Sequence, residues 1–134
     1  MTTVLFACVH NAGRSQMAEA FFNALADPAQ ARAVSAGTEP AAGVHPEVAE
    51  AMRELGIDVS GARPLRLTES VARTASLLIT MGCGEACPFV PGLRREDWSL
   101  EDPKGKGAEG VRRIRDAVRT RVLDLIRQNG WARS

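Results

Sequence analysis

The stretch TVLFACVHNAGRSQMAEAFFNALA, residues 3–26, decides the fold that we expect. Residues 3–8 form a nearly continuous apolar run, which is typical of a strand buried on both faces of a parallel sheet. Residues 15–26 repeat apolar side chains at helical spacing, on a stripe made of Met17, Ala18, Phe21, Phe22 and Leu25. The stretch therefore predicts a strand, a tight loop and a helix.

The rest of the chain continues this alternation. The patterns predict further strands over 31–37 and 76–81, and helices over 45–56, 68–75 and 108–130. Pro46 suits a first helical turn, Thr68 suits an N-cap, and Gly56 and Gly130 suit helix C-termini. Residues 82–107 are rich in Gly, Pro and charge and predict long loops around a short element near 97–100. Alternating strands and helices indicate an α/β sandwich with a mainly parallel sheet, whose functional loops follow the carboxyl ends of the strands.

Length and charge narrow the class of protein. The 134 residues suit one domain, which we expect to span 1–134. Seventeen basic and sixteen acidic residues give a net charge of +1, so nucleic acid and an anionic membrane are not expected partners. No apolar run is long enough to cross a bilayer, and the first residues do not resemble a signal peptide. We therefore expect a cytoplasmic protein. Because the cytoplasm is reducing, the three cysteines of the chain are not expected to form structural disulfides.

The loop after the first strand has the features of an oxyanion site. A loop that leaves a strand and enters a helix collects free backbone N–H groups at the positive end of the helix dipole. The small residue Gly13 allows a positive φ, and Arg14 offers a planar fork of donors. These surroundings and the Ser15 hydroxyl favour a Cys8 thiolate poised to attack the central atom of the anion. The expected oxyanion-binding residues are Val9, His10, Asn11, Ala12, Gly13, Arg14 and Ser15. In the alternative reading, Cys8 is a small buried hydrophobe and Arg14 is a surface side chain.

The pattern C-x5-R-S, residues 8–15, resembles the phosphate loop of low-molecular-weight tyrosine phosphatases and of the arsenate reductases built on the same fold. The resemblance implies a three-layer sandwich around a central, mainly parallel four-stranded sheet. It also implies that Asp102, in Asp102-Pro103, is a general acid that protonates the departing oxygen, with Asn11 orienting the loop. Without the resemblance, Asp102 would read as part of an ordinary turn.

Two further cysteines favour the reductase branch. A phosphatase needs one cysteine, whereas reduction needs two electrons, which thiols supply in pairs. Cys83 and Cys87, with the later Asp97-Trp98, resemble the thioredoxin-coupled arsenate reductases, although their four-residue separation is shorter and resembles an actinobacterial-type variant. The resemblance implies a Cys8/Cys83/Cys87 relay in which Cys83 attacks Cys8 and Cys87 attacks Cys83. The pair could instead be unrelated thiols, or half of a zinc site completed by Cys8, His10 and His45.

The implied substrate is arsenate, with phosphate or sulfate as mimics, and the implied reductant is thioredoxin. A small thiol with a glutaredoxin-like partner remains the alternative reductant, and we expect no resident metal or cofactor.

A phosphotyrosine phosphatase is the alternative enzyme, but it needs an aromatic wall beside the loop, and the nearest candidates in the sequence are Trp98 and Phe89. A module that only captures anions would leave the cysteines without a role. The arginines of 108–130 are expected on a solvated face, and His45 is expected at a helix start without a catalytic role.

Overall fold

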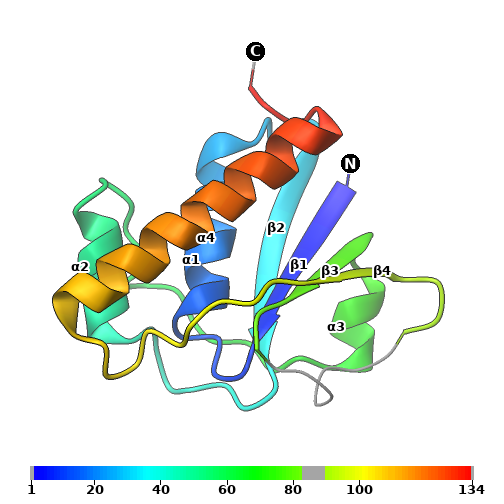
Figure 1. Ribbon diagram of the computed structural model, residues 1–134. Coiled ribbons are helices and arrows are strands. Elements are labelled where there is room, and N and C mark those ends of the chain that lie inside the picture. Colours follow the sequence, from blue (N-terminus) through cyan, green and yellow to red (C-terminus); the bar gives the residue numbers. More distant parts are fainter. Residues whose placement is uncertain (1, 83–89, 134) are drawn as a thin grey trace.

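The computed structural model describes residues 2–82 and 90–133 (Figure 1). Its strands are β1 (Thr2–Cys8), β2 (Ala31–Gly37), β3 (Leu77–Thr80) and β4 (Arg94–Asp97). Its helices are α1 (Arg14–Leu25), α2 (Pro46–Arg53), α3 (Glu69–Arg73) and α4 (Gly107–Asn129). The strands form one sheet in the order β2-β1-β3-β4, and every pairing is parallel. The predicted parallel four-stranded sheet is therefore confirmed.

The sheet is covered on both faces, which gives the predicted three layers. In β1, Val4 and Phe6 face the core under α1, α2 and α4, whereas Leu5 and Ala7 face a smaller core on the side of α3. Figure 1 shows the three longer helices on one side of the sheet and α3 on the other. Because both faces of β1 are buried, its sequence is apolar at successive positions rather than at alternate ones.

The helix ends follow the predicted signals. Thr68 caps α3 by accepting a hydrogen bond from the Val71 N–H, as expected. Helix α2 ends at Arg53, three residues before Gly56, but the chain continues in a turn that closes at Gly56, where φ is +79°. The N–H of Ile57 donates to the Met52 carbonyl there, which completes a Schellman motif. Gly130 ends α4 in the same left-handed conformation.

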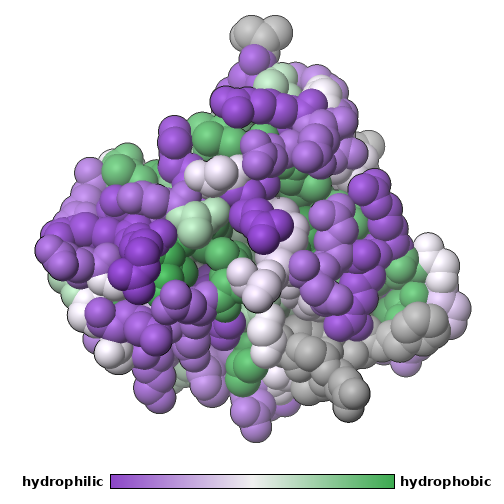
Figure 2. All heavy atoms as spheres, in the orientation of Figure 1, coloured by the Kyte–Doolittle hydropathy of each residue, from purple (hydrophilic) through white to green (hydrophobic). Residues whose placement is uncertain are grey.

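Two expectations about the C-terminal half were wrong. The fourth strand is Arg94–Asp97, earlier than the short element expected near 97–100, because a charged and mostly exposed edge strand lacks an apolar pattern. Arg115 is 8% exposed and does not lie on a solvated face, because it donates to the Ala51 carbonyl and to Glu54 across the α2–α4 interface. Other α4 arginines are exposed, and Figure 2 shows hydrophilic residues over much of this helix. In the described part of the chain, no helix is long and apolar enough to cross a membrane.

Candidate active site

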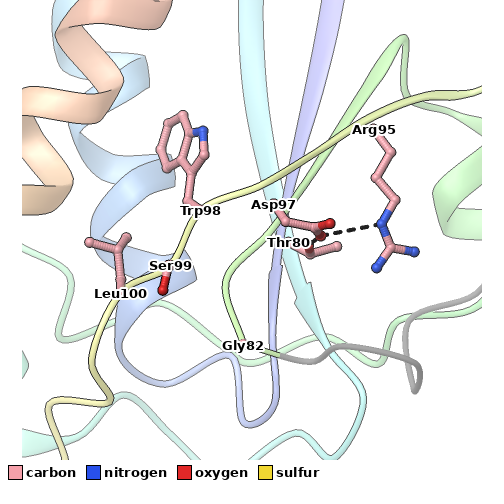
Figure 3. Close-up of a pocket in the computed structure, with 7 residues that line it drawn as sticks. All are labelled: Thr80, Gly82, Arg95, Asp97, Trp98, Ser99 and Leu100. Carbon is pink, nitrogen blue, oxygen red and sulfur yellow. Dashed lines mark hydrogen bonds and ion pairs between the residues drawn. The ribbon is translucent and has the colours of Figure 1, made fainter.

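The candidate site lies at the carboxyl edge of the sheet, where the loop after β1 meets the segments after β3 and β4. Cys8 ends β1 opposite Gly37 of β2, and Thr80 of β3 pairs with Asp97 of β4. A pocket of about 290 Å³ opens between the ends of β3 and β4 (Figure 3). The lining residues are Thr80, Gly82, Arg95, Asp97, Trp98, Ser99 and Leu100.

The carbonyl groups of the loop point outward. Each carbonyl of residues 8–13 accepts a hydrogen bond, and four of the donors are backbone N–H groups between residues 38 and 45. The donors are the N–H groups of Thr38, Glu39, Ala41, His45 and Met17 and the side-chain amide of Gln16. The backbone N–H groups of residues 9–14 have no acceptor among the described residues. Since the carbonyls are bonded to the surroundings, these N–H groups are available to an anion, and their binding of one stays a prediction.

Asn11 holds the shape of the loop. It is fully buried and adopts φ +49°, a left-handed conformation that asparagine tolerates better than most residues. Its Oδ1 accepts from the Leu65 N–H at 2.9 Å, and its Nδ2 donates to Ser15 Oγ at 2.7 Å. Asn11 therefore makes the hydrogen bonds that an orienting role requires, and the role itself stays a prediction.

Gly13 has a different role from the one predicted. Its φ is −137°, so the left-handed residue of the loop is Asn11 and not Gly13. A Cβ at Gly13 would lie 2.9 Å from Cγ of Pro103, which is closer than real Cβ atoms approach a neighbour. Gly13 therefore lets the Asp102-Pro103 loop pack directly on the oxyanion loop.

Cys8 and Ser15 are in direct contact at the end of β1. Cys8 is 2% exposed, and its Sγ lies 2.8 Å from Ser15 Oγ. Because the hydroxyl oxygen already accepts from Asn11, its proton is free to donate to the sulfur when Cys8 is a thiolate. The predicted donation from Ser15 therefore has the required geometry.

Arg14 and Asp102 are brought together. The guanidinium of Arg14 lies 3.9 Å from Asp102 Oδ2 and donates through Nη1 to the Leu100 carbonyl at 3.2 Å. The Arg14 side chain is 9% exposed, whereas that of Asp102 is 48% exposed. A half-exposed carboxylate therefore lies beside the buried cation of the loop.

The histidines lie beside the loop. His10 is part of it and has Nδ1 3.1 Å from the Glu39 carbonyl. His45 precedes α2, as expected, and its backbone N–H donates to the Ala12 carbonyl at 3.0 Å. The two rings have centroids 6.5 Å apart. The role of His45 in holding the loop is through its backbone, which no side-chain pattern could reveal.

Some supporting residues were missed by sequence reasoning. A Cβ at Gly37 would lie 2.6 Å from the Val9 carbonyl oxygen and 2.8 Å from the Asn11 nitrogen. The one signal in the sequence is a glycine where a strand ends. Leu65 and Leu100 act through their backbone N–H and carbonyl groups and leave no signal at all.

Trp98 does not form an aromatic wall. It is 5% exposed, and its ring packs on Phe6 of β1 with the centroids 5.6 Å apart. Figure 3 shows its ring directed away from Gly82 and towards the helices. Phe89, the other candidate, lies outside the described residues, as do Cys83 and Cys87. Within residues 2–82 and 90–133, no three His, Cys, Asp or Glu side chains are grouped to hold a metal ion.

Comparisons with known proteins agree with this geometry. Residues 3–130 match the family described as low molecular weight phosphotyrosine protein phosphatase. An arsenate reductase of Staphylococcus epidermidis is 35% identical over 125 residues, which cover 90% of this chain and 92% of that protein. A solved arsenate reductase in its oxidised state is 36% identical with a TM-score of 0.84, over 96% of this chain and 98% of that one.

A thioredoxin-dependent arsenate reductase of Corynebacterium glutamicum is 39% identical with a TM-score of 0.82. The match covers 96% of this chain but 61% of that one, so the present chain spans less than two thirds of that relative. The family match and the relatives at more than a third identity extend over nearly the whole sequence. The chain therefore belongs to the low molecular weight phosphotyrosine protein phosphatase family, which it shares with the arsenate reductases that it resembles.

Proposed function

We propose that this protein reduces arsenate to arsenite, with the Cys8 thiolate as the nucleophile. The observation that supports this most is the 2.8 Å contact between Cys8 Sγ and Ser15 Oγ beneath a loop whose N–H groups have no acceptor among the described residues. The reductase relatives in the same family support the choice of substrate. Arsenate is a tetrahedral oxyanion, so phosphate and sulfate would act as mimics in the same cradle.

The first step is in-line attack on arsenic. The N–H groups of residues 9–14 and the Arg14 guanidinium hold the arsenate oxygens, because oriented donors and a buried cation stabilise the anion as its charge shifts. The Cys8 sulfur forms a bond to arsenic while an oxygen leaves. Asp102 protonates that oxygen, so that water departs and a Cys8–arsenate adduct remains. The 3.9 Å approach of Asp102 to Arg14 supports this assignment.

The second stage supplies the electrons. The Cys83 thiolate attacks the Cys8 sulfur, and the S–As electron pair remains on arsenic, which leaves as arsenite. Cys87 then attacks Cys83, which frees the Cys8 thiolate and leaves a Cys83–Cys87 disulfide. Two thiols are thus oxidised for each arsenic reduced. Both cysteines lie outside the described residues, so this order rests on their chemistry and on the resemblance.

We propose thioredoxin as the reductant of that disulfide, in the cytoplasm, where thiols are kept reduced. The Corynebacterium glutamicum relative, described as thioredoxin-dependent, supports the choice. The rival route uses a small thiol that attacks the Cys8 adduct directly, followed by a glutaredoxin-like protein. That route needs Cys8 alone.

Phosphotyrosine hydrolysis is the second candidate function, because the family model carries that description. The burial of Trp98 against Phe6 is the observation against it, since a phosphotyrosine ring needs an aromatic wall beside the loop. A small inorganic oxyanion needs no such wall.

The test is arsenate-dependent oxidation of NADPH with thioredoxin and thioredoxin reductase, run beside hydrolysis of a phosphotyrosine analogue. We expect arsenate turnover by the unaltered protein and its loss in Cys8→Ser, Cys83→Ser and Cys87→Ser. Phosphate binding by the last two variants serves as the control for folding. Full thioredoxin-coupled turnover by Cys83→Ser or Cys87→Ser would contradict the relay, and brisk hydrolysis without arsenate turnover would favour the phosphatase.

A further inference from the structure

Gly82 follows β3 and lies against the guanidinium of Arg14. A Cβ at this position would lie 3.2 Å from Cζ of Arg14, 3.4 Å from Nη2 and closer still to Nη1. All three nearest neighbours of that Cβ are therefore atoms of the guanidinium. Any side chain at position 82 would occupy the place that Arg14 now holds.

Backbone conformation alone does not explain this glycine. Gly82 has φ +100°, but other described glycines with positive φ have open space where a Cβ would be. These glycines are Gly56, Gly92, Gly105, Gly107 and Gly130. Gly82 thus combines a left-handed backbone with a close contact that the others lack, and the contact is with the cation of the oxyanion site.

Other groups restrict where the guanidinium could go. The Leu100 carbonyl accepts from Nη1 at 3.2 Å, and the Asp102 carboxylate lies 3.9 Å from Nη2. The Arg14 side chain is 9% exposed. The guanidinium lies against Gly82, which follows β3, and donates to Leu100, which follows β4. Gly82 and Leu100 also line the pocket drawn in Figure 3. A Cβ that pushed it away from Gly82 would therefore alter its contacts with Leu100 and Asp102 as well.

The cost of such a push would fall on binding more than on folding. The atoms that would have to move belong to the end of a long, flexible side chain and not to the backbone. The fold can therefore accommodate the change by rotating Arg14, but the donors of Arg14 would then no longer be aimed where they are now.

We propose that Gly82 is a positioning residue for oxyanion binding, because the absence of a side chain at this position leaves the space that the Arg14 guanidinium occupies. This inference rests on the oxyanion site of the proposed function, but not on the reduction of arsenate. A substitution at Gly82 acts only through Arg14, so its effect disappears when Arg14 is absent.

The test compares Gly82→Ala with Gly56→Ala, which introduces the same side chain at a left-handed glycine with open space. The probe is inorganic phosphate, titrated by calorimetry and by amide NMR shifts under reducing conditions at constant ionic strength. We expect phosphate to bind about tenfold to a hundredfold more weakly to Gly82→Ala, the range for a lost charge-assisted hydrogen bond. We expect Gly56→Ala to bind phosphate like the unaltered protein.

The same pair is then made in an Arg14→Ala background. We expect Gly82→Ala to cause no further loss there, either in phosphate affinity or in kcat/KM for arsenate. Unchanged phosphate affinity in Gly82→Ala would overturn the proposal, and so would an equal loss with and without Arg14. If arsenate turnover is absent in every protein, the phosphate titrations still decide the role of Gly82, so failure of the reductase assignment is distinguishable.

Discussion

Asn11→Ala should destabilise the protein mainly through two hydrogen bonds and one backbone conformation. The side chain bonds Ser15 Oγ and the Leu65 N–H, and each lost bond costs about 1 kcal/mol. A third side-chain bond, from Gln16 Nε2 to Asn11 Oδ1 at 3.3 Å, adds little, because Gln16 Nε2 keeps its bond to the Asn11 carbonyl. Alanine must also adopt the left-handed φ of +49°, which adds about 1 kcal/mol. We expect a total loss of about 3 kcal/mol in the free energy of unfolding, measured by urea denaturation.

Two further variants separate these contributions. Asn11→Gly removes the same hydrogen bonds but accepts the left-handed conformation, so it should be about 1 kcal/mol more stable than Asn11→Ala. Asn23→Ala is the matched control, because Asn23 also makes two hydrogen bonds, with Ala33, but lies exposed in right-handed helix α1. We expect it to cost only about 1 kcal/mol, because water replaces the bonds of an exposed side chain and alanine favours the helix more than asparagine does. If Asn11→Ala costs no more than Asn23→Ala, Asn11 does not hold the loop as argued.

Three other outcomes follow from the structure. Gly13→Ala should push Pro103 and its neighbour Asp102 outward, because the new Cβ would lie 2.9 Å from Pro103 Cγ. We therefore expect kcat for arsenate, measured by steady-state kinetics, to fall more than phosphate affinity, measured by calorimetry. Equal losses in the two quantities would argue against this. The hydrogen bond from Arg112, followed by that from Arg115, lowers the pKa of Glu54 below 4.5. The stability that ionised Glu54 contributes is present above its unfolded pKa and is lost as pH falls through its folded pKa. Glu54→Gln should therefore lower the free energy of unfolding at pH 7 but match the unaltered protein in acid. Urea unfolding at both pH values would show this. Burial raises the pKa of Glu19 above 4.5, despite hydrogen bonds from Ser35. Ionised Glu19 therefore lowers the stability of the folded protein above its folded pKa. The free energy of unfolding of Glu19→Gln, relative to that of the unaltered protein, should be higher at pH 7 than at pH 4. A difference between the two proteins that does not vary with pH would contradict this.

The first strand, loop and helix could be predicted because their signals are local. The apolar run of β1 is continuous, since both faces are buried, and α1 repeats its apolar residues at helical spacing. The same holds for α4 and its closing glycine. In contrast, β4 consists of Arg94, Arg95, Glu96 and Asp97, and its strand conformation depends on pairing with β3, which no local pattern encodes.

Within the site, residue types were predictable but their geometry was not. The pattern around Cys8 predicts a nucleophile and an oxyanion loop, and these roles stay predictions, but it assigned the positive φ to Gly13 because glycine adopts it most easily. Asn11 takes that conformation instead, held by the backbone N–H of Leu65, 54 positions away in the sequence. Such long-range backbone contacts depend on the completed fold. The roles of Cys83 and Cys87 stay predictions.

The central claim, reduction of arsenate by the chain's own thiols, is tested most directly by a single turnover. Fully reduced protein, freed of small thiols, is mixed with excess arsenate in the absence of thioredoxin. Arsenite is quantified, and the disulfide is located by peptide mass spectrometry. We expect one arsenite for each protein chain, together with a Cys83–Cys87 disulfide and a free Cys8 thiol. Absence of arsenite until a small thiol is added, with Cys83 and Cys87 still reduced, would contradict the account.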